Sequence, residues 1–377
     1  MPKTIAITPS WYWPAGTSRV VGVPPFSIYD LCISRNAARM PRQPAIVDAS
    51  GALTFEGLKA EVDARAHALA LAVGESRSAH LPGELTRDNV IGLLAGLAAG
   101  VALHVPSDAT AQAGHGGGAG SATPGDSQLP LGTFDPTLPA LSLDGDSGVV
   151  QHSNRSLLAM AISMATYLDA DPAGPWLSTL PLSRWEGLMA TIIPLYLGAP
   201  LVIPPQNADP DALLGLIPRH GVKYTIADLP GFSHACREAK RAAKDSRRLL
   251  AWALLAVDGP FDPDQRRRVS KALECPALTF WGTAETGPVF ASHPSWYIDE
   301  SVGLPMTNAH VVPSDPRSGQ PIQALWELVE LAEVTVFSPS LPVLAATPSL
   351  RLAGNRVRTG MLASSDANGM IYLLGRS

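Results

Sequence analysis

The chain is poor in charge and in cysteine. Charged residues make up 16% of its 377 residues, the formal net charge is −5, and no block of basic residues interrupts it. This balance argues against nucleic acid as a partner. The three cysteines, Cys32, Cys236 and Cys275, are too few and too widely spaced to indicate a disulfide framework or a zinc site. They fit a reducing, cytoplasmic setting.

Long apolar runs are also missing. The N-terminus, MPKTIAITPSWYWPAG, has neither an extended apolar core nor a small-residue cleavage site, which argues against secretion. The stretch from Val90 to Val105 is apolar but contains three glycines and is too short to cross a bilayer. It predicts a buried helix followed by a strand, and we expect no membrane partner.

What the chain does have is a large hydrophobic fraction, 46%, which is enough for an extensive core and two or three subdomains. Helical patterns at 26–41 and 55–73 flank a hairpin-like turn at 49–52. Residues 211–240 predict a helix, a strand and a second helix.

A further helix should follow the Asp258-Gly259-Pro260 turn. Asp262 would be its N-cap, and Pro263 would lie in its first turn. The run Arg266-Arg267-Arg268 is typical of a solvated helix face.

Residues 111–147 have a different composition. Glycine, alanine, serine and proline dominate much of this segment, so we expect a flexible loop or linker. His115 lies inside it without other ligand residues nearby, and we interpret it as solvated.

The segment TFWGTAETGPVF, residues 279–290, is the most informative motif. A β-type run ends in small residues and a single carboxylate, Glu285. A lone acid in such a turn suits Mg²⁺ that phosphate oxygens already hold. The alternative is a strand-to-loop corner whose acid faces water, and the motif alone leaves both interpretations open.

This motif resembles the Tyr-Gly-x-Thr-Glu signature of the adenylate-forming superfamily. That superfamily includes acyl- and aryl-CoA synthetases, peptide-synthetase adenylation domains and luciferases. The chain reads Trp281-Gly282-Thr283-Ala284-Glu285. Two longer segments are similar to family motifs in the same order, WLSTLPLSRWEGLMATIIPLYLGAPLVIPP and NRVRTGMLASSDANGMIYLLGRS.

The resemblance implies an α/β fold, the N-terminal domain of an adenylate-forming enzyme without its C-terminal lid. We expect an extension at 1–25, paired α/β/α-type subdomains at 26–300 with the 111–147 loop inside them, and a small β-subdomain at 301–377 that ends at the hinge.

The resemblance also implies roles for individual residues. Trp281, Gly282, Thr283 and Ala284 would border the adenine, and Glu285 would bind Mg²⁺. The ribose and phosphate wall would consist of Thr359, Gly360, Met361 and Arg376. The acyl pocket would be bordered by Ser183, Arg184, Trp185 and Gly187. Arg184 would either hold a substrate carboxylate as a bidentate partner or be a surface arginine beside Glu186, and we favour the latter.

Several positions depart from the family pattern. Ala284 replaces the threonine, and Met361 replaces the aspartate that holds the ribose, which removes roughly 1.5–3 kcal/mol of charge-assisted hydrogen bonding. The phosphate loop is reduced to a turn with Asp144 and Asp146 and without the lysine. These acids would repel a triphosphate unless Mg²⁺ intervened; we favour a solvent-exposed turn. The hinge and the lid with its catalytic lysine are expected to be missing after Ser377.

We therefore expect ATP- and Mg²⁺-dependent adenylation of an acyl or aryl carboxylic acid for transfer to CoA or a carrier-protein thiol. The activity would be weak, or would depend on a partner such as a separate lid domain. The alternatives are a catalytically inactive pseudo-enzyme that serves as a binding or scaffold module, and a gene fragment without an independent role.

Overall fold

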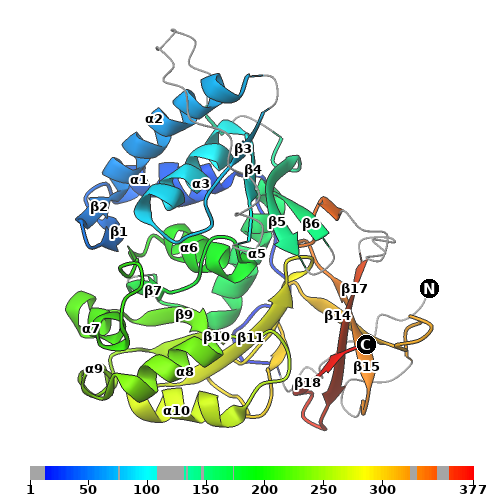
Figure 1. Cartoon of the computed structure of the whole chain (residues 1–377). Helices are drawn as coiled ribbons and strands as arrows, with labels where there is room; N and C mark the ends of the chain where they lie inside the picture. The colour runs from blue at the N-terminus through cyan, green and yellow to red at the C-terminus, as the bar shows by residue number, and fades with distance from the viewer. Residues whose placement is uncertain are drawn as a thin grey trace.

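The computed structural model describes residues 13–74, 77–107, 131–132, 135–145, 148–172, 174–322, 329–345 and 356–377. These residues form three sheets, of nine, five and four strands. In Figure 1 the five-stranded sheet lies above the nine-stranded sheet, and the four-stranded sheet lies to the right of both. The α/β architecture with a small antiparallel sheet near the C-terminus confirms the expected fold class.

The five-stranded sheet has a buried face and a polar face. Its order is β16 (Leu344–Ala345), β6 (Gly148–Ser153), β5 (Pro139–Gly145), β4 (Ala102–Val105) and β3 (Ser78–His80). Leu103 and Val105 of β4 enter the core with α3 (Arg87–Ala99) and α5 (Asn154–Leu168), whereas His104 is partly exposed. This alternation is typical of a sheet that is covered on one face.

The nine-stranded sheet contains a doubly wound unit. Five parallel strands lie in the order β8 (Leu201–Val202), β7 (Trp176–Ser178), β9 (Tyr224–Asp228), β10 (Trp252–Ala256) and β11 (Ala277–Thr283). At its edges are the hairpin β1 (Pro44–Asp48) and β2 (Gly51–Thr54), and the antiparallel strands β12 (Gly287–Ala291) and β13 (Leu304–Pro305). The chain reverses its winding direction between β7 and β9, which is where a doubly wound sheet opens a crevice at the carboxyl ends of its strands.

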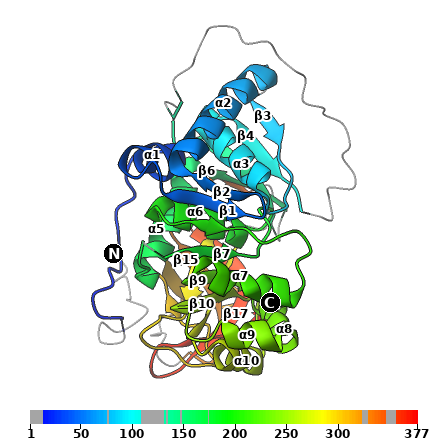
Figure 2. The same ribbon diagram turned by 90° about the vertical axis from the view of Figure 1, so that its left-hand side faces the viewer.

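Helices cover this unit on both faces. Helix α6 (Trp185–Leu197) packs with α5 in one hydrophobic core. Helices α7 (Pro210–His220), α8 (Leu229–Glu238), α9 (Lys240–Asp245) and α10 (Pro263–Leu273) contribute to a second core. Figure 2 shows α8, α9 and α10 at the bottom of the molecule and α2 (Phe55–Val73) at the top.

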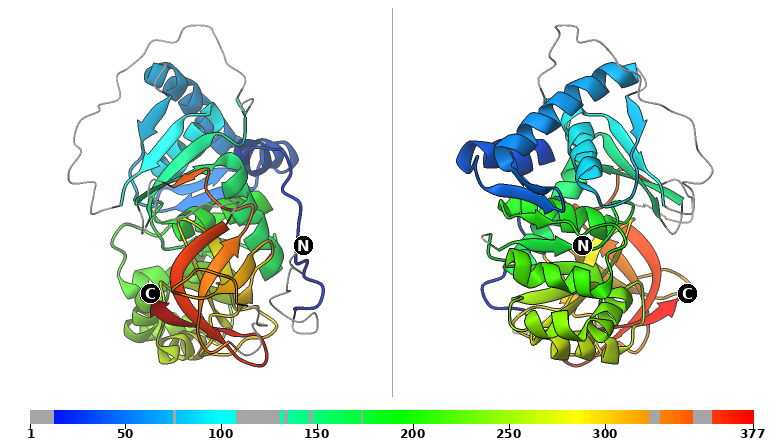
Figure 3. Two further views of the ribbon diagram at one scale, coloured as in Figure 1. Left: turned by 90° about the vertical axis from the view of Figure 1, so that its right-hand side faces the viewer. Right: turned by 60° about the vertical axis from the view of Figure 1, so that its left-hand side comes forward.

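The four-stranded sheet consists of β14 (His310–Ser314), β15 (Ala332–Phe337), β17 (Arg356–Ser365) and β18 (Ile371–Arg376). Figure 3, left, shows its orange and red strands beside the lower part of the molecule. Met361 and Ile371 of this sheet belong to the same core as Trp281 of β11, so the sheet packs against the doubly wound unit.

Several local predictions are confirmed. The first helical segment forms a π-helical turn, Tyr29–Ser34, followed by α1 (Arg35–Arg39), and the β1–β2 hairpin precedes α2 as expected. The side chain of Asp262 caps α10 by accepting from the backbone N–H of Asp264. Among the described residues, no helix is long and apolar enough to cross a membrane.

Two predictions need correction. The segment expected to be a loop, 111–147, contains strand β5 from Pro139 onward, because its last residues alternate apolar and polar side chains. His115 and Asp146 lie outside the described residues. The second correction concerns Arg266, which is completely buried rather than solvated.

Arg266 links α10 to the nine-stranded sheet. Its Nε donates to the carbonyl of Ala277 at 2.6 Å, and its Nη1 donates to the carbonyls of Ile298 at 2.9 Å and Ser301 at 3.0 Å. The guanidinium also lies 4.3 Å from the ring centroid of Tyr297. Burial lowers the pKa of Arg266 to about 10, so the side chain remains charged at neutral pH. One side chain thus donates to several buried carbonyls, two of which also accept from a second donor: Ile298 from the N–H of Ser301, and Ser301 from the hydroxyl of Thr279.

Candidate functional site

The crevice position of the doubly wound unit holds a cluster of charged side chains. Arg184 is the N-cap of α6, a few residues after β7, and Asp228 ends β9. The Nη2 of Arg184 lies 3.0 Å from Oε1 of Glu186 and 2.9 Å from Oδ1 of Asp258, which follows β10. The carboxyl ends of three neighbouring strands thus meet at one arginine.

Burial separates the two acids that bind Arg184. Glu186 is only 4% exposed, whereas the side chain of Asp258 is 83% exposed. Burial raises the pKa of the Glu186 carboxyl, and Arg184 opposes that shift. Burial alone would lower the pKa of the Arg184 guanidinium, but Glu186, Asp258 and Asp228 raise it above its usual range. Arg184 is therefore a fixed cation beside Glu186, as favoured from the sequence, although this pair is largely buried rather than superficial.

Trp185 and Gly187 shape the space beside this cluster. The ring of Trp185 packs edge-on against Phe280, with centroids 5.7 Å apart. If Gly282 carried a Cβ atom, that atom would lie 3.1 Å from Cζ2 of Trp185. The indole therefore occupies space that a side chain at position 282 would need. A Cβ at Gly187 would lie 1.8 Å from the carbonyl oxygen of Pro181. The predicted pocket residue Trp185 and the predicted adenine residue Gly282 are therefore direct neighbours.

Glu285 lies against the hairpin that takes the place of the phosphate loop. Gly145 lies at the end of β5 and has no side chain. If it carried a Cβ atom, that atom would lie only 2.6 Å from Oε1 of Glu285, so the carboxylate packs closely against this glycine. The side chain is 3% exposed. Glu285 follows the end of β11 at Thr283, in the turn that joins β11 to β12 in a hairpin. Its proximity to the reduced loop agrees with the position implied by the family.

The turn around Glu285 is held by hydrogen bonds. The backbone N–H of Thr283 donates to Oγ1 of Thr286 at 3.0 Å, and this hydroxyl donates to the carbonyl of Gly287 at 2.9 Å. Ala284 is buried, and its carbonyl lies 2.7 Å from Nε2 of His152. Since a carbonyl oxygen only accepts, Nε2 carries the proton of a neutral imidazole. His152 was not singled out from the sequence, and nothing in its local pattern marks it as buried.

The buried imidazole of His152 predicts a loss of stability in acid. Burial lowers the pKa of His152 to about 4, whereas an unfolded histidine titrates near 6.5. As pH falls through this window, the unfolded state is therefore protonated first. The free energy of unfolding should decrease by about 2 kcal/mol between pH ~7 and pH ~5. Chemical denaturation at both pH values should show this loss, and His152→Gln should reduce it. Equal pH dependence in both proteins would contradict the assignment.

Trp281 occupies a different environment from that implied by the family. Its indole is 1% exposed and stacks on Phe290, with ring centroids 5.7 Å apart. The ring lies in the core, so the expectation that this side chain borders an adenine is not supported by its orientation. Any contact with a nucleotide would come from the backbone at this end of β11.

The remaining predicted wall lies on β17 and β18. Met361 pairs with Arg376 across these strands, and Met361 is 1% exposed whereas Arg376 is exposed. A Cβ atom on Gly259 would lie 3.7 Å from Cε of Met361. Gly259 follows Asp258, the exposed acid that binds Arg184. Thr359 Oγ1 donates to the carbonyl of Val334, and Gly360 N–H donates to Oε1 of Glu333. Met361 is thus a residue of the four-stranded sheet that lies near the crevice. Its thioether is only a weak hydrogen-bond acceptor and is poorly suited to bind ribose hydroxyls.

Asp144 is held by hydrogen bonds at the end of β5. Its Oδ2 accepts from the backbone N–H and the hydroxyl of Ser107, each at 2.9 Å, and its side chain is 23% exposed. Asp144 is thus partly exposed, and Asp146 of the same turn lies outside the described residues, so the interpretation of a solvent-exposed turn stays a prediction. The hydrogen bonds to Ser107 hold the end of β5 against the end of β4.

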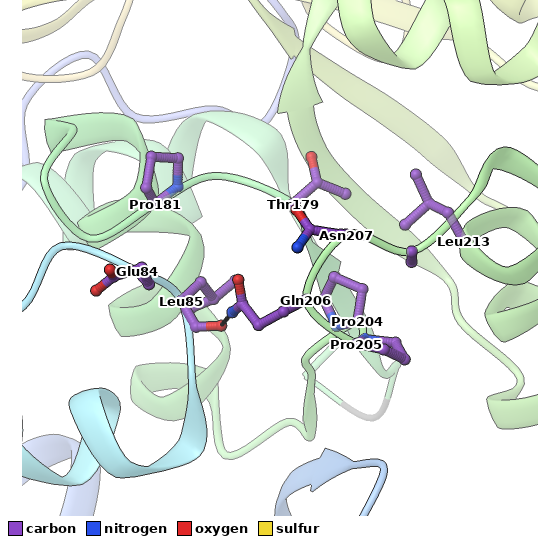
Figure 4. A pocket seen from close by; sticks show the side chains of 10 residues that line it. Glu84, Leu85, Thr179, Pro181, Pro204, Pro205, Gln206, Asn207 and Leu213 are labelled. Atoms are coloured by element: carbon purple, nitrogen blue, oxygen red, sulfur yellow. Dashed lines mark hydrogen bonds between the residues drawn. The ribbon is translucent and has the colours of Figure 1, made fainter. Parts of the chain in front are cut away.

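A cavity of about 330 Å³ lies next to Pro181, at the carboxyl ends of β7 and β8. Figure 4 shows Thr179 and Asn207 close together, and Gln206, whose amide donates to the carbonyl of Leu85 at 2.9 Å. The volume is at the lower end of the range for small-molecule sites. None of the residues predicted from the sequence lines this cavity.

Comparison with known proteins agrees with this geometry. Residues 147–329 match the sequence profile of the family described as AMP-binding enzyme. A search of curated protein sequences gives no match. Among solved structures, O-succinylbenzoate coenzyme A synthetase (MenE) from Bacillus subtilis, in complex with ATP and magnesium ion, superposes with a TM-score of 0.77 at 18% identity, covering 92% of this chain and 79% of that chain.

Two further structures share the fold. The amide bond synthetase McbA from Marinactinospora thermotolerans has a TM-score of 0.74 at 20% identity and covers 93% of this chain and 79% of that chain. CmiS6 has a TM-score of 0.72 at 19% identity and covers 97% of this chain and 100% of that chain. Over residues 147–329 the chain is therefore similar to AMP-binding enzymes. Its fold as a whole is shared with these three structures.

Proposed function

We propose that this chain is an adenylate-forming ligase that activates a small acyl or aryl carboxylic acid, with an active site reduced relative to the family pattern. The observation that carries the proposal is the contact of Glu285 with Gly145. It joins the acidic turn of the nine-stranded sheet to the hairpin of the five-stranded sheet. The family uses these two elements for Mg²⁺ and phosphate, and they lie together here.

The residues present fit a magnesium ion better than they fit a nucleotide. The carboxylate of Glu285 is a suitable oxygen ligand, whereas Met361 offers the ribose only a weak acceptor. When bound, Mg²⁺·ATP supplies the adenylyl group, and the reaction joins it to the substrate carboxylate with release of pyrophosphate. Glu285 would hold the cation, the backbone at Gly282 and Thr283 would border the base, and Arg376 would contact ribose or phosphate.

The acid would bind in the crevice beside Arg184. The Nε and Nη2 of this side chain donate to Glu186, and Nη2 also donates to Asp258. These bonds orient Arg184 and neutralise its charge, so a substrate carboxylate would bind it by replacing the exposed partner, Asp258. The indole of Trp185 fills the space beside Gly282 and favours a small acyl or aryl group. The activated group would pass to CoA or to a carrier-protein thiol, and the three unpaired cysteines fit a cytoplasmic enzyme.

Exchange between ATP and labelled pyrophosphate tests the proposal. The full chain should catalyse exchange with at least one acid in a panel of short acyl and aryl acids, alone or with an added carrier protein or lid domain. Glu285→Gln should lower the rate by about 10²–10³-fold, because it removes the carboxylate charge that would hold Mg²⁺. The matched control is Glu56→Gln on the exposed surface of α2, which should leave the rate unchanged.

A second candidate function is that of a non-catalytic binding or scaffold module. The low exposure of Glu285 and Met361, 3% and 1%, favours it, because neither side chain presents polar atoms to an open cleft. Calorimetry with Mg²⁺·ATP separates the two. A Kd below about 1 mM supports the ligase, whereas no binding together with no exchange in any arm supports the scaffold.

A further inference from the structure

Two histidines face each other on the polar side of the five-stranded sheet. Strands β3 and β4 are parallel neighbours, and His80 lies directly opposite His104 in their register. Both side chains reach solvent, and that of His104 is 31% exposed. The residues directly before and after His104 in β4 are buried and face the core. His80 and His104 therefore lie on the opposite face of the sheet.

The separation of the two imidazoles matches that of two ligands on one metal ion. The Nδ1 atoms of His80 and His104 are 3.3 Å apart, and the ring planes are inclined by 78°. Two nitrogens about 2.0–2.1 Å from a tetrahedral zinc ion are about 3.3–3.4 Å from each other. The two nitrogens therefore already have the spacing of one edge of a tetrahedral site.

Asp144 lies beside one of the two rings, just beyond hydrogen-bond distance. Its Oδ1 lies 3.6 Å from Nε2 of His104, and this shielded nitrogen makes no hydrogen bond to a described residue. The same carboxylate is held by the backbone N–H and hydroxyl of Ser107, each at 2.9 Å. A carboxylate behind a histidine favours the tautomer with the proton on the near nitrogen. The lone pair of the far nitrogen, Nδ1, then points toward His80.

We propose that His80 and His104 form a binding site for a divalent transition-metal cation of the zinc and nickel class, with Asp144 as a positioning residue. Both ligands are imidazoles, which suit these cations and not Mg²⁺ or Ca²⁺. No group of three or more such ligands occurs in the parts of the chain that the structure describes, so water completes the coordination. The two histidines lie on β3 and β4, whereas the proposed magnesium ligand Glu285 lies in the β11–β12 turn and approaches Gly145, the residue after Asp144.

Metal titration of the untagged, full-length protein tests this site. After treatment with a chelator, the protein should bind one equivalent of Ni²⁺ or Zn²⁺ by calorimetry, and its thermal midpoint should rise with the metal. Either His80→Gln or His104→Gln should remove this binding. Asp144→Asn should weaken it by about 10- to 100-fold, since the ring loses its orienting partner. Mg²⁺ at the same concentration should give no such signal.

Two controls separate the site from other causes of binding. His67→Gln changes a partly exposed histidine on α2 and should bind the metal like the wild type. Glu285→Gln should also bind normally, so that failure of the ligase proposal and failure of this one can be told apart. The variants of the exposed and partly exposed histidines, His67, His80 and His104, should have the wild-type thermal midpoint without metal. The inference is overturned if the His80→Gln/His104→Gln double variant binds as tightly as the wild type.

Discussion

Replacing Gly187 by alanine is expected to destabilise the protein by more than about 4 kcal/mol. The new Cβ would lie 1.8 Å from the carbonyl oxygen of Pro181 and 2.7 Å from its carbonyl carbon. These are backbone atoms, so no side-chain rotation relieves the overlap. The segment before α6 would have to move, and it carries Ser183 and Arg184. The variant should therefore lose both stability and the charged cluster of the crevice.

A second glycine-to-alanine variant provides the control for Gly187→Ala. Gly215 lies inside α7, and a Cβ there would meet no atom within 4 Å. Gly215→Ala should be neutral or stabilising by up to about 1 kcal/mol, because alanine is the better helix former. Urea denaturation of the three proteins measures both effects. Similar stability for the two variants would contradict this prediction, because it would show that the backbone at Pro181 can move at little energetic cost.

Replacing Arg266 by methionine is expected to cost about 3–5 kcal/mol. Methionine conserves much of the volume but donates no hydrogen bond. The carbonyl of Ala277 would lose the donor that Arg266 provides, and the carbonyls of Ile298 and Ser301 would each lose one of two donors. Each unsatisfied buried carbonyl costs roughly 1–3 kcal/mol, and water entry would recover part of it.

The neighbouring Arg268 offers a matched control for Arg266→Met. It lies two residues further along α10, is partly exposed, and its side chain donates to the hydroxyl of Ser233 at 2.9 Å. Arg268→Met should therefore cost about 1 kcal/mol or less. Guanidinium denaturation measured by fluorescence would compare the two variants. A small effect at Arg266 would mean that hydrophobic packing compensates for the lost donors.

The sequence predicts the elements of this fold well because their signals are local. The helical periodicity of α2, the cap at Asp262 and the apolar run of β10 need no knowledge of distant contacts. The order of the family motifs then predicts the fold class. Trp185 and Gly282, assigned to the acyl pocket and the adenine site, are neighbours in the structure, and their roles stay predictions.

Burial of polar side chains could not be predicted in the same way. Arg266 has the sequence neighbours of a surface arginine, and its burial is favourable because of acceptors on other segments, the carbonyl of Ala277 and those of 298–301. The burial of Glu186 and His152 depends in the same way on Arg184 and on the carbonyl of Ala284. In each case the partner that satisfies the polar group comes from another element or a nearby turn.

The alternation of side chains along β9, β10 and β11 has a consequence for how the molecule responds to a disturbance. Ile226 belongs to the core beneath α6, whereas its neighbour Ala227 belongs to the core beneath α7 and α8. Leu254 and Leu255 of β10 divide in the same way. A strand that is anchored on both faces cannot loosen on one side alone. The two layers should therefore melt as a single cooperative unit, and a movement of α6 would be felt by the helices on the opposite face.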